Sequence, residues 1–220
     1  MENKPYFTKI RGEYQLASER SSELYRNIAQ ALQPNLKGVV TDFGNGGIIN
    51  YDTSGLSKVI CIDIINEQKD LSESRIDHIY GDFYNLKLER DSDCFLAQFL
   101  LHHLTDDEKV LSSLRNIKGK LNPDGKLIVV EIDLPPWVER MQAILLPALK
   151  RVLSLMHKPQ IRFFSSGRLI RLLEDAGFEN ISLQTIPIGK KVSPAPVLFP
   201  RMQIPGKLYP FRIIMLKARL

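Results

Sequence analysis

Several features are scarce or absent in this chain of 220 residues, and these absences argue against particular kinds of protein and site. No run of about 18 uncharged apolar residues occurs, and the N-terminus lacks the basic-then-apolar order of a signal peptide, so we expect a cytoplasmic protein without a membrane span. The two cysteines, Cys61 and Cys94, fall inside apolar runs, which predicts small buried thiols. Because no HExxH, CxxC or clustered carboxylate spacing is present, we expect no metal site.

Acidic residues are scarce in the last third of the sequence. Residues 1–136 hold 16 Lys and Arg against 21 Asp and Glu, a net charge of −5, whereas residues 137–220 hold 14 against 4, a net charge of +10. A basic C-terminal third could meet an anionic substrate, nucleic acid or an acidic membrane surface. The alternative is a solubilising face on otherwise apolar helices.

Apolar residues make up 44% of the chain, which at this length predicts one domain over residues 1–220 with appendages. Leu24, Ile28 and Leu32 form one stripe of a helix expected over residues 18–33. Near-continuous apolar runs are typical of parallel strands covered on both faces. The expected strands are residues 39–43, 58–64, 77–80, 93–99 and 126–133, with a final pair, possibly antiparallel, over 180–188 and 208–220.

Helix signals separate the later strands. Thr105 and Glu108 form a capping box, which predicts a helix from Asp106 that ends before a turn at residues 122–125. The apolar stretch 137–157 is expected to be helical, with a kink or break at Pro147. A further helix is capped by Ser165 or Ser166 and closed by Gly177. Strands that alternate with helices predict an α/β fold with a mostly parallel sheet.

The stretch from residue 38 to 64 has the layout of a nucleotide-binding strand-turn-strand unit. Gly44, Gly46 and Gly47 follow the first strand, and Asp63 stands at the end of the second, where it could accept hydrogen bonds from ribose hydroxyls. Ligands in such sheets bind beyond the carboxyl ends of the strands, where Asp82 and residues 98–103 also fall.

Five segments, taken together, resemble class I S-adenosylmethionine-dependent methyltransferases of the small-molecule kind, which includes the quinone and polyketide methyltransferases. The segments are VTDFGNGG, the acid Asp63, GDF at residues 81–83, DCFLAQFLLHHLTD and LNPDGKLIVVE, and the resemblance covers residues 38–178. It implies a Rossmann-like sheet of seven strands in the order 3-2-1-4-5-7-6, with the last strand antiparallel and helices on both faces.

The resemblance also implies S-adenosyl-L-methionine as cofactor and assigns its contacts. The glycine loop would shape the pocket for the methionine part, Asp63 would hold the ribose diol, and Ile64 would pack on the adenine. Asp82 would meet the adenine amine with Phe83 near the ring, and Gln98 would face the sulfonium. The loop residues are Asp42, Gly44, Asn45, Gly46 and Gly47.

The loop departs from the family pattern in two ways. The third glycine of the family falls at Ile48, and residues 50–55 are turn-like where a full helix is normal. We therefore expect a shortened or distorted helix after the loop.

Methyl transfer needs a base only if the acceptor must lose a proton. His102 and His103 follow the fourth strand and are candidates for that base, although the pair could instead pack and cap the loop. Glu131 and Asp133 at the end of the fifth strand are the next candidates, with Asp133 nearer the expected acceptor; turn formation is their alternative role.

Relatives build substrate covers where this chain has residues 137–164 and 190–207, and residues 1–37 would form an N-terminal helical cap. Both covers are rich in apolar side chains with adjoining cations, which favours a small hydrophobic or aromatic and possibly anionic acceptor. The alternatives are an RNA methyltransferase, although no N/D-P-P-Y/F motif is present, and a cofactor-binding protein that does not methylate, such as a cyclase or partner subunit. Peripheral membrane contact and a homodimer both stay open.

Overall fold

The structure is a computed structural model that describes residues 19, 21–46, 48–64, 75–81, 91–104, 106–155, 161–194 and 202–220. Its centre is a sheet of seven strands in the order β3-β2-β1-β4-β5-β9-β6. Neighbouring strands from β3 to β5 pair in parallel, whereas β9 is antiparallel to both β5 and β6. The strands are β1 Val39–Phe43, β2 Lys58–Asp63, β3 Ile76–Tyr80, β4 Ser92–Gln98, β5 Leu121–Asp133, β6 Glu179–Ile186 and β9 Arg212–Arg219.

Because β9 is the seventh strand of this sheet in chain order, the predicted order 3-2-1-4-5-7-6 with an antiparallel seventh strand is confirmed. Apolar runs explain the centre of the sheet, since strands buried on both faces need no alternation of polar and apolar residues. The two cysteines lie in β2 and β4 as free, buried thiols, as the sequence predicted.

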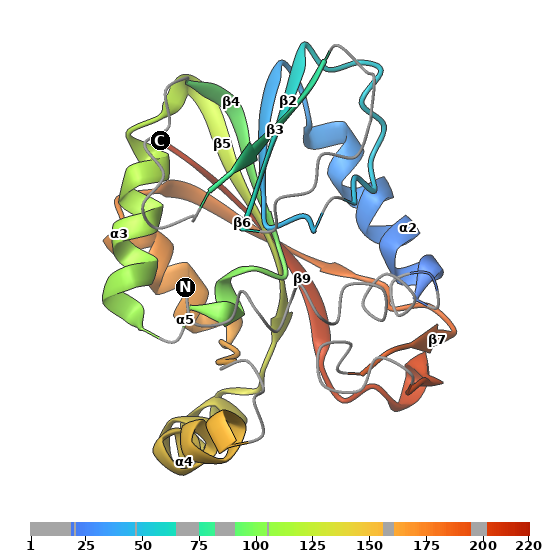
Figure 1. The fold of residues 1–220 in the computed structure, drawn as a ribbon, viewed down its shortest axis with the longest axis vertical. Coiled ribbons are helices and arrows are strands. Elements are labelled where there is room, and N and C mark those ends of the chain that lie inside the picture. Colours follow the sequence, from blue (N-terminus) through green and yellow to red (C-terminus); the bar gives the residue numbers. More distant parts are fainter. Residues whose placement is uncertain are drawn as a thin grey trace.

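Helices cover both faces of the sheet (Figure 1). On one face α3, Asp107–Lys118, and α5, Ser166–Asp175, bury their apolar stripes in one core cluster. On the other face α2, Ser22–Leu32, buries Leu24, Ile28 and Leu32 in a second cluster with residues of the central strands. The expected stripe of the first helix is therefore confirmed, and the start expected at Ser18 falls outside the described residues. A 3-10 turn, η1 Gln33–Asn35, follows α2.

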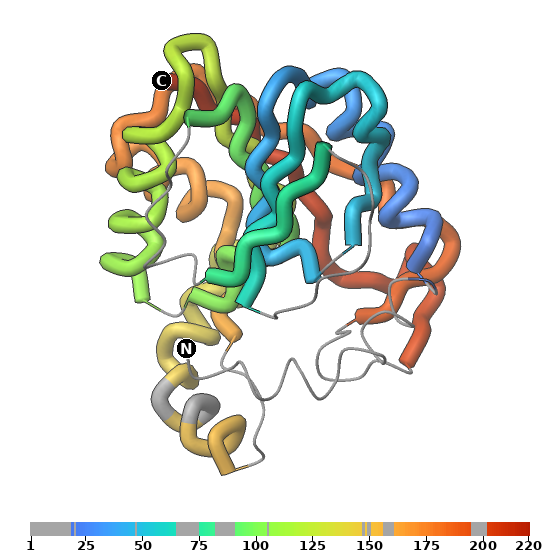
Figure 2. The backbone as a smooth tube through the Cα atoms, turned by 45° about the horizontal axis from the view of Figure 1, so that its top comes forward, coloured from blue at the N-terminus to red at the C-terminus, as the bar shows by residue number. Residues whose placement is uncertain are grey.

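The start of α2 lies beside the chain that follows β6, as the blue and orange tubes show (Figure 2). Asn27 Nδ2 donates to Pro187 O at 2.9 Å, and Glu23 Oε2 accepts from Lys190 N at 2.8 Å. That chain enters a small hairpin of β7, Lys191–Val192, and β8, Ile204–Pro205, followed by the 3-10 turn η3, Gly206–Leu208. The described part of the predicted cover 190–207 is therefore tied to the N-terminal helix.

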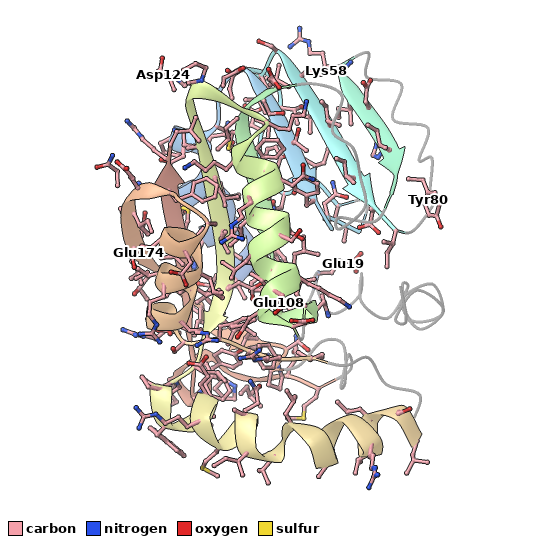
Figure 3. All side chains as sticks on the ribbon, turned by 90° about the vertical axis from the view of Figure 1, so that its left-hand side faces the viewer. Glu19, Lys58, Tyr80, Glu108, Asp124 and Glu174 are labelled. Carbon is pink, nitrogen blue, oxygen red and sulfur yellow. The ribbon has the colours of Figure 1, made fainter. Side chains whose placement is uncertain are left out.

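The helix α4, Pro136–Leu155, follows β5 at once and lies across the carboxyl ends of the parallel strands, apart from the other helices (Figure 3). Asp124 near the start of β5 marks the opposite end of the molecule, and Glu108 in the first turn of α3 lies between the two ends. The helix is continuous for 20 residues, so the predicted break at Pro147 is wrong.

Two further boundaries differ from the sequence prediction. The N-cap of α3 is Asp106, whose side chain accepts from Glu108 N at 3.0 Å; the predicted cap, Thr105, lies outside the described residues. The strand β5 begins at Leu121 and includes the predicted turn at residues 122–125, which falls in a register shift opposite Ser92 and Cys94. The predicted cap of α5 is confirmed at Ser165, and Gly177 follows that helix with φ +86°.

No helix occurs between β1 and β2 in the described residues 48–57. This stretch holds turns instead, such as Leu56 N to Thr53 O at 3.0 Å. We expected a shortened or distorted helix after the glycine loop, and the described residues there form no helix.

Candidate active site

The glycine turn bends the chain sharply at the end of β1. Gly44 and Gly46 have φ values of +66° and +60°, a conformation that glycine adopts without steric cost. Gly44 N donates to Ile62 O at 2.8 Å, and Gly46 N donates to Asp63 Oδ2 at 2.9 Å. A Cβ atom at Gly46 would meet no heavy atom within 4 Å, so the turn borders open space. The predicted residue Asn45 belongs to the same turn, with its carbonyl accepting from Ile48 N at 2.9 Å.

Asp42 lies beneath this turn and is fully buried. Its Oδ2 accepts from the hydroxyl of Tyr51 at 3.0 Å. Burial raises the pKa of Asp42 to about 7, against hydrogen bonds from Tyr51 and Asn45, which lower it. Tyr51 comes from the stretch that replaces the helix, so an aromatic side chain fills this space and supports the acid.

A pair of amides connects that stretch to β4. Asn50 Nδ2 donates to Gln98 Oε1 at 3.0 Å, and Gln98 Nε2 donates to Asn50 Oδ1 at 3.1 Å. The pair bridges two neighbouring strand ends, because Asn50 follows β1 and Gln98 ends β4. The predicted residue Gln98 is thereby held at the edge of the sheet beside the glycine turn.

The chain reverses sharply after β4. Phe99 has φ +51°, an unusual conformation for a bulky residue, and its N donates to Val130 O at 2.8 Å. Its ring lies 6.3 Å from that of Tyr25, which places part of α2 beside this turn. The short 3-10 turn η2, Leu101–His103, follows and presents the two histidines. Strained backbone of this kind concentrates at functional sites.

His102 and Glu131 form a buried pair. The His102 Nδ1 atom lies 2.9 Å from Glu131 Oε2, and both side chains are almost fully buried. The ring of Phe163 lies 5.1 Å from the imidazole, and Arg162 N donates to His102 O at 2.8 Å. The segment that leads into α5 therefore packs against the histidine.

The two other predicted catalytic residues occupy different environments. His103 packs against His102, and burial followed by the charge of His102 lowers the pKa of His103 well below 6.5. Asp133 is buried with both oxygens engaged: Oδ1 accepts from Ser166 N at 2.6 Å and Oδ2 from Arg212 Nη2 at 2.5 Å. These contacts connect Asp133 to the start of α5 and to the start of β9.

The structure gathers most of the predicted site at one edge of the sheet. Asp42, Gly44, Asn45, Gly46, Asp63, Ile64 and Gln98 lie at the ends of β1, β2 and β4, beside the histidines. The predicted residues Gly47, Asp82 and Phe83 lie outside the described residues. The open space at Gly46 and the buried acid Asp42 beneath it suit a ligand with polar groups at the glycine turn.

Sequence reasoning missed Asn50, Tyr51 and Phe163. Each of them contacts a site residue that is distant in the sequence. The separation is 9 residues for Tyr51 and Asp42 and 61 residues for Phe163 and His102. The turn-like composition of residues 50–55 indicated an irregular stretch, but no motif marked which side chains point inward.

A seven-stranded sheet of this order, with a glycine turn and an acid at neighbouring strand ends, defines the class I methyltransferase fold. Residues 19–179 match the O-methyltransferase domain family. The chain belongs to this family of S-adenosylmethionine-dependent methyltransferases.

Individual relatives are more distant. Over 103 aligned residues the chain is 33% identical to O-methyltransferase 12 of Dictyostelium discoideum. These residues make up 47% of this chain and 23% of that protein. The chain thus spans about a quarter of that relative.

Among solved structures, 1,6-didemethyltoxoflavin-N1-methyltransferase of Burkholderia thailandensis, with bound 1,6-didemethyltoxoflavin and S-adenosylhomocysteine, has a TM-score of 0.66 at 17% identity; 99% of this chain and 87% of that chain are covered. Human N-acetylserotonin methyltransferase in complex with SAM has a TM-score of 0.57 at 18% identity, covering 98% and 56%. At these identities the likeness shows the fold alone.

The described residues contain no helix with the length and apolar content that crossing a bilayer requires. They also contain no cluster of three or more His, Cys, Asp or Glu side chains that could hold a metal ion.

Proposed function

We propose that this protein transfers a methyl group from S-adenosylmethionine to a small hydrophobic or aromatic acceptor that loses a proton to His102. The main support for the proposal is the buried pair of His102 and Glu131, near the strand ends where the cofactor would bind. Family membership supports the reaction class, and the geometry of the pair supports acid–base chemistry at this position.

The cofactor would be held by the glycine turn and its neighbours. The backbone at Gly44 and Gly46 would border its methionine part, and Asp63 would accept hydrogen bonds from the ribose. When bound, the cofactor supplies an electrophilic methyl group on a sulfonium. Because the described residues 48–57 hold no helix, the turn lacks the usual helix-terminus site for an anion. The side-chain amides of Asn50 and Gln98 at this edge of the sheet would offer N–H groups instead.

The hydrogen bond to Glu131 orients His102 for proton abstraction. A carboxylate accepts from a ring N–H, so the contact to Nδ1 leaves the lone pair on Nε2. Nε2 would take the acceptor proton as the acceptor oxygen or nitrogen bonds to the methyl carbon, and Glu131 would stabilise the resulting imidazolium. His103 is a poor base at neutral pH, since burial and the charge of His102 hold its pKa well below 6.5.

The acceptor would lie between the histidines and the cover formed by residues 137–164 and 190–207. Phe163 supports this location, because its ring packs on the imidazole at the end of the sheet from which α4 departs. An aromatic or apolar acceptor suits such a lining, and polar groups would only fix its orientation.

The test compares His102→Gln with His103→Gln on a panel of phenols and aromatic amines. We expect His102→Gln to lower kcat by about 10²- to 10⁴-fold, the usual contribution of a general base, with cofactor affinity unchanged by calorimetry. His103→Gln should retain most of the activity. Glu131→Gln should also lower kcat and should shift the pH profile of the rate, since it removes the charge that stabilises the imidazolium.

Equal activity of wild type and His102→Gln would overturn the base assignment. If the cofactor binds but mass spectrometry finds no added CH₂ on any acceptor, the protein is instead a cofactor-binding member that does not methylate.

A further inference from the structure

The helix α4 carries a continuous apolar stripe on the face turned away from the rest of the molecule. Six large apolar side chains are 50% to 82% exposed: Trp137, Met141, Ile144, Leu145, Val152 and Leu155. At 100° per residue, their spacing places them within one 100°-wide sector that runs the length of the helix, about 30 Å. A row of side chains on the outer side of α4 is visible in Figure 3.

Hydrogen bonds connect the opposite face of α4 to the segment that leads into α5. Gln142 exchanges two hydrogen bonds with the backbone of Phe163, at 2.8 and 3.1 Å, and Glu139 Oε2 accepts from Ser165 N at 3.2 Å. None of the side chains described in α4 is buried. A soluble monomer rarely exposes a contiguous apolar patch of more than a few hundred Å². The apolar stripe of α4 therefore indicates an interaction surface.

The charges along the stripe indicate what covers it. Arg140 and Arg151 are exposed and, by helical spacing, lie along the same edge of the stripe. Glu139, the only acid in the α4 sequence, is engaged on the body side. Two copies that packed α4 on α4 in an antiparallel pair would bring equivalent edges together and oppose arginine to arginine. An anionic surface instead complements them.

We propose that α4 is an interfacial helix that docks the protein on an anionic phospholipid membrane, with its apolar stripe among the acyl chains and its arginines at the headgroups. Aromatic and aliphatic side chains on one face with basic residues at its border are the pattern of helices that lie in the membrane plane. The docked orientation would turn the carboxyl edge of the sheet, and the candidate active site, toward the lipid. The inference does not depend on methyl transfer.

Vesicle sedimentation tests this with neutral phosphatidylcholine and with phosphatidylcholine containing phosphatidylglycerol. The wild type should sediment with the anionic vesicles and bind neutral ones at least about tenfold more weakly. Ile144→Glu with Leu155→Glu should lower binding to anionic vesicles by at least about tenfold. Leu183→Glu, the same change at a residue of β6 that is 42% exposed, should leave it unchanged. Circular dichroism of each variant checks that the fold is retained.

The arginines have a separate test. Arg140→Gln with Arg151→Gln should remove most of the preference for anionic vesicles and its sensitivity to salt. The proposal is overturned if the wild type does not bind vesicles, if the double glutamate variant binds like the wild type, or if neutral and anionic vesicles bind equally. Concentration-dependent self-association that the glutamate variant abolishes, without vesicle binding, would assign the stripe to a second copy of the chain.

Discussion

Asp42 is completely buried and depends on hydrogen bonds from Tyr51 and Asn45, so its charge state is sensitive to its surroundings. Its pKa of about 7 in the fold exceeds the 3.8 that is usual for an aspartate. The folded protein therefore holds this proton more tightly than the unfolded chain, and the contribution of the acid to stability falls as pH rises from about 4 to about 7. A positively charged ligand at the glycine turn would favour ionised Asp42 and oppose this loss.

We expect the free energy of unfolding of Asp42→Asn to rise relative to that of the wild type as the pH rises from about 4 to about 7. The change in this difference is on the order of 4 kcal/mol, which corresponds to the shift in the pKa of Asp42. Asparagine keeps an oxygen that can accept from Tyr51 but does not ionise. Urea unfolding of the cofactor-free proteins at pH 4, 5.5 and 7.5 measures the difference. Stability curves of the two proteins that stay parallel over this range would contradict the assignment.

Residue identities were the part of the site most accessible from sequence. The glycine turn and the acid at the end of β2 are marked in the sequence because a sharp turn after a strand and a carboxylate at the next strand end restrict the residue types at fixed offsets. The partners were not accessible: Glu131 was a candidate in its own right, yet nothing in the chain showed that its carboxylate faces His102. Contacts between side chains distant in sequence depend on strand register, which motifs do not encode.

At the scale of the elements, Asp133 joins three of them. The residue ends β5, its Oδ1 accepts from the first residue of α5, and its Oδ2 pairs with Arg212 at the start of β9. Because Asp133 is buried, its removal leaves the Ser166 N–H without a partner, whereas Arg212 is exposed enough to be hydrated.

We expect Asp133→Ala to lower the free energy of unfolding by about 1–3 kcal/mol while cofactor affinity and kcat below the melting transition change little. Denaturant unfolding and steady-state kinetics on one preparation separate the two effects. Loss of kcat at unchanged stability would instead restore Asp133 to the catalytic role that its position in the sequence suggested.

Element types followed from periodicity and apolar runs, and boundaries depended on local chemistry. Asp106 competes successfully with the predicted Thr105 as cap of α3, because both are good cap residues and the sequence alone does not rank neighbours. Pro147 does not break α4, which shows that the helix tolerates the lost hydrogen bond, although an interior proline usually costs several kcal/mol.

At the scale of the whole molecule, the net charge of +10 on residues 137–220 is partly neutralised by ion pairs within the protein. Arg162 and Arg168 both pair with Asp107, and Arg212 pairs with Asp133. Lys118 of the preceding segment donates to Gly177 O. Internal pairing of this kind reduces the field that a nucleic acid would meet.

We therefore expect only weak binding of single-stranded RNA, which is lost by about 150 mM salt. Fluorescence anisotropy with a labelled oligonucleotide, repeated between about 50 and 200 mM salt, measures the affinity and its salt slope. Tight binding at the upper salt concentration would support the RNA methyltransferase alternative. Glutamine substitutions at Lys190 and Lys191, two exposed lysines beside the small hairpin, would then locate the contact.

The position of β9 between β5 and β6 has a consequence for how the protein is made. Of the described strands β9 is the last to leave the ribosome, yet it pairs with β6 between Glu179 and Ile186 and with β5 from Lys126 to Asp133. Until it emerges, β5 presents an unpaired edge, and β6 has no strand beside it in the sheet. A nascent chain arrested before Arg212 should therefore need protection from aggregation, and release of the final strand is the event that completes the sheet.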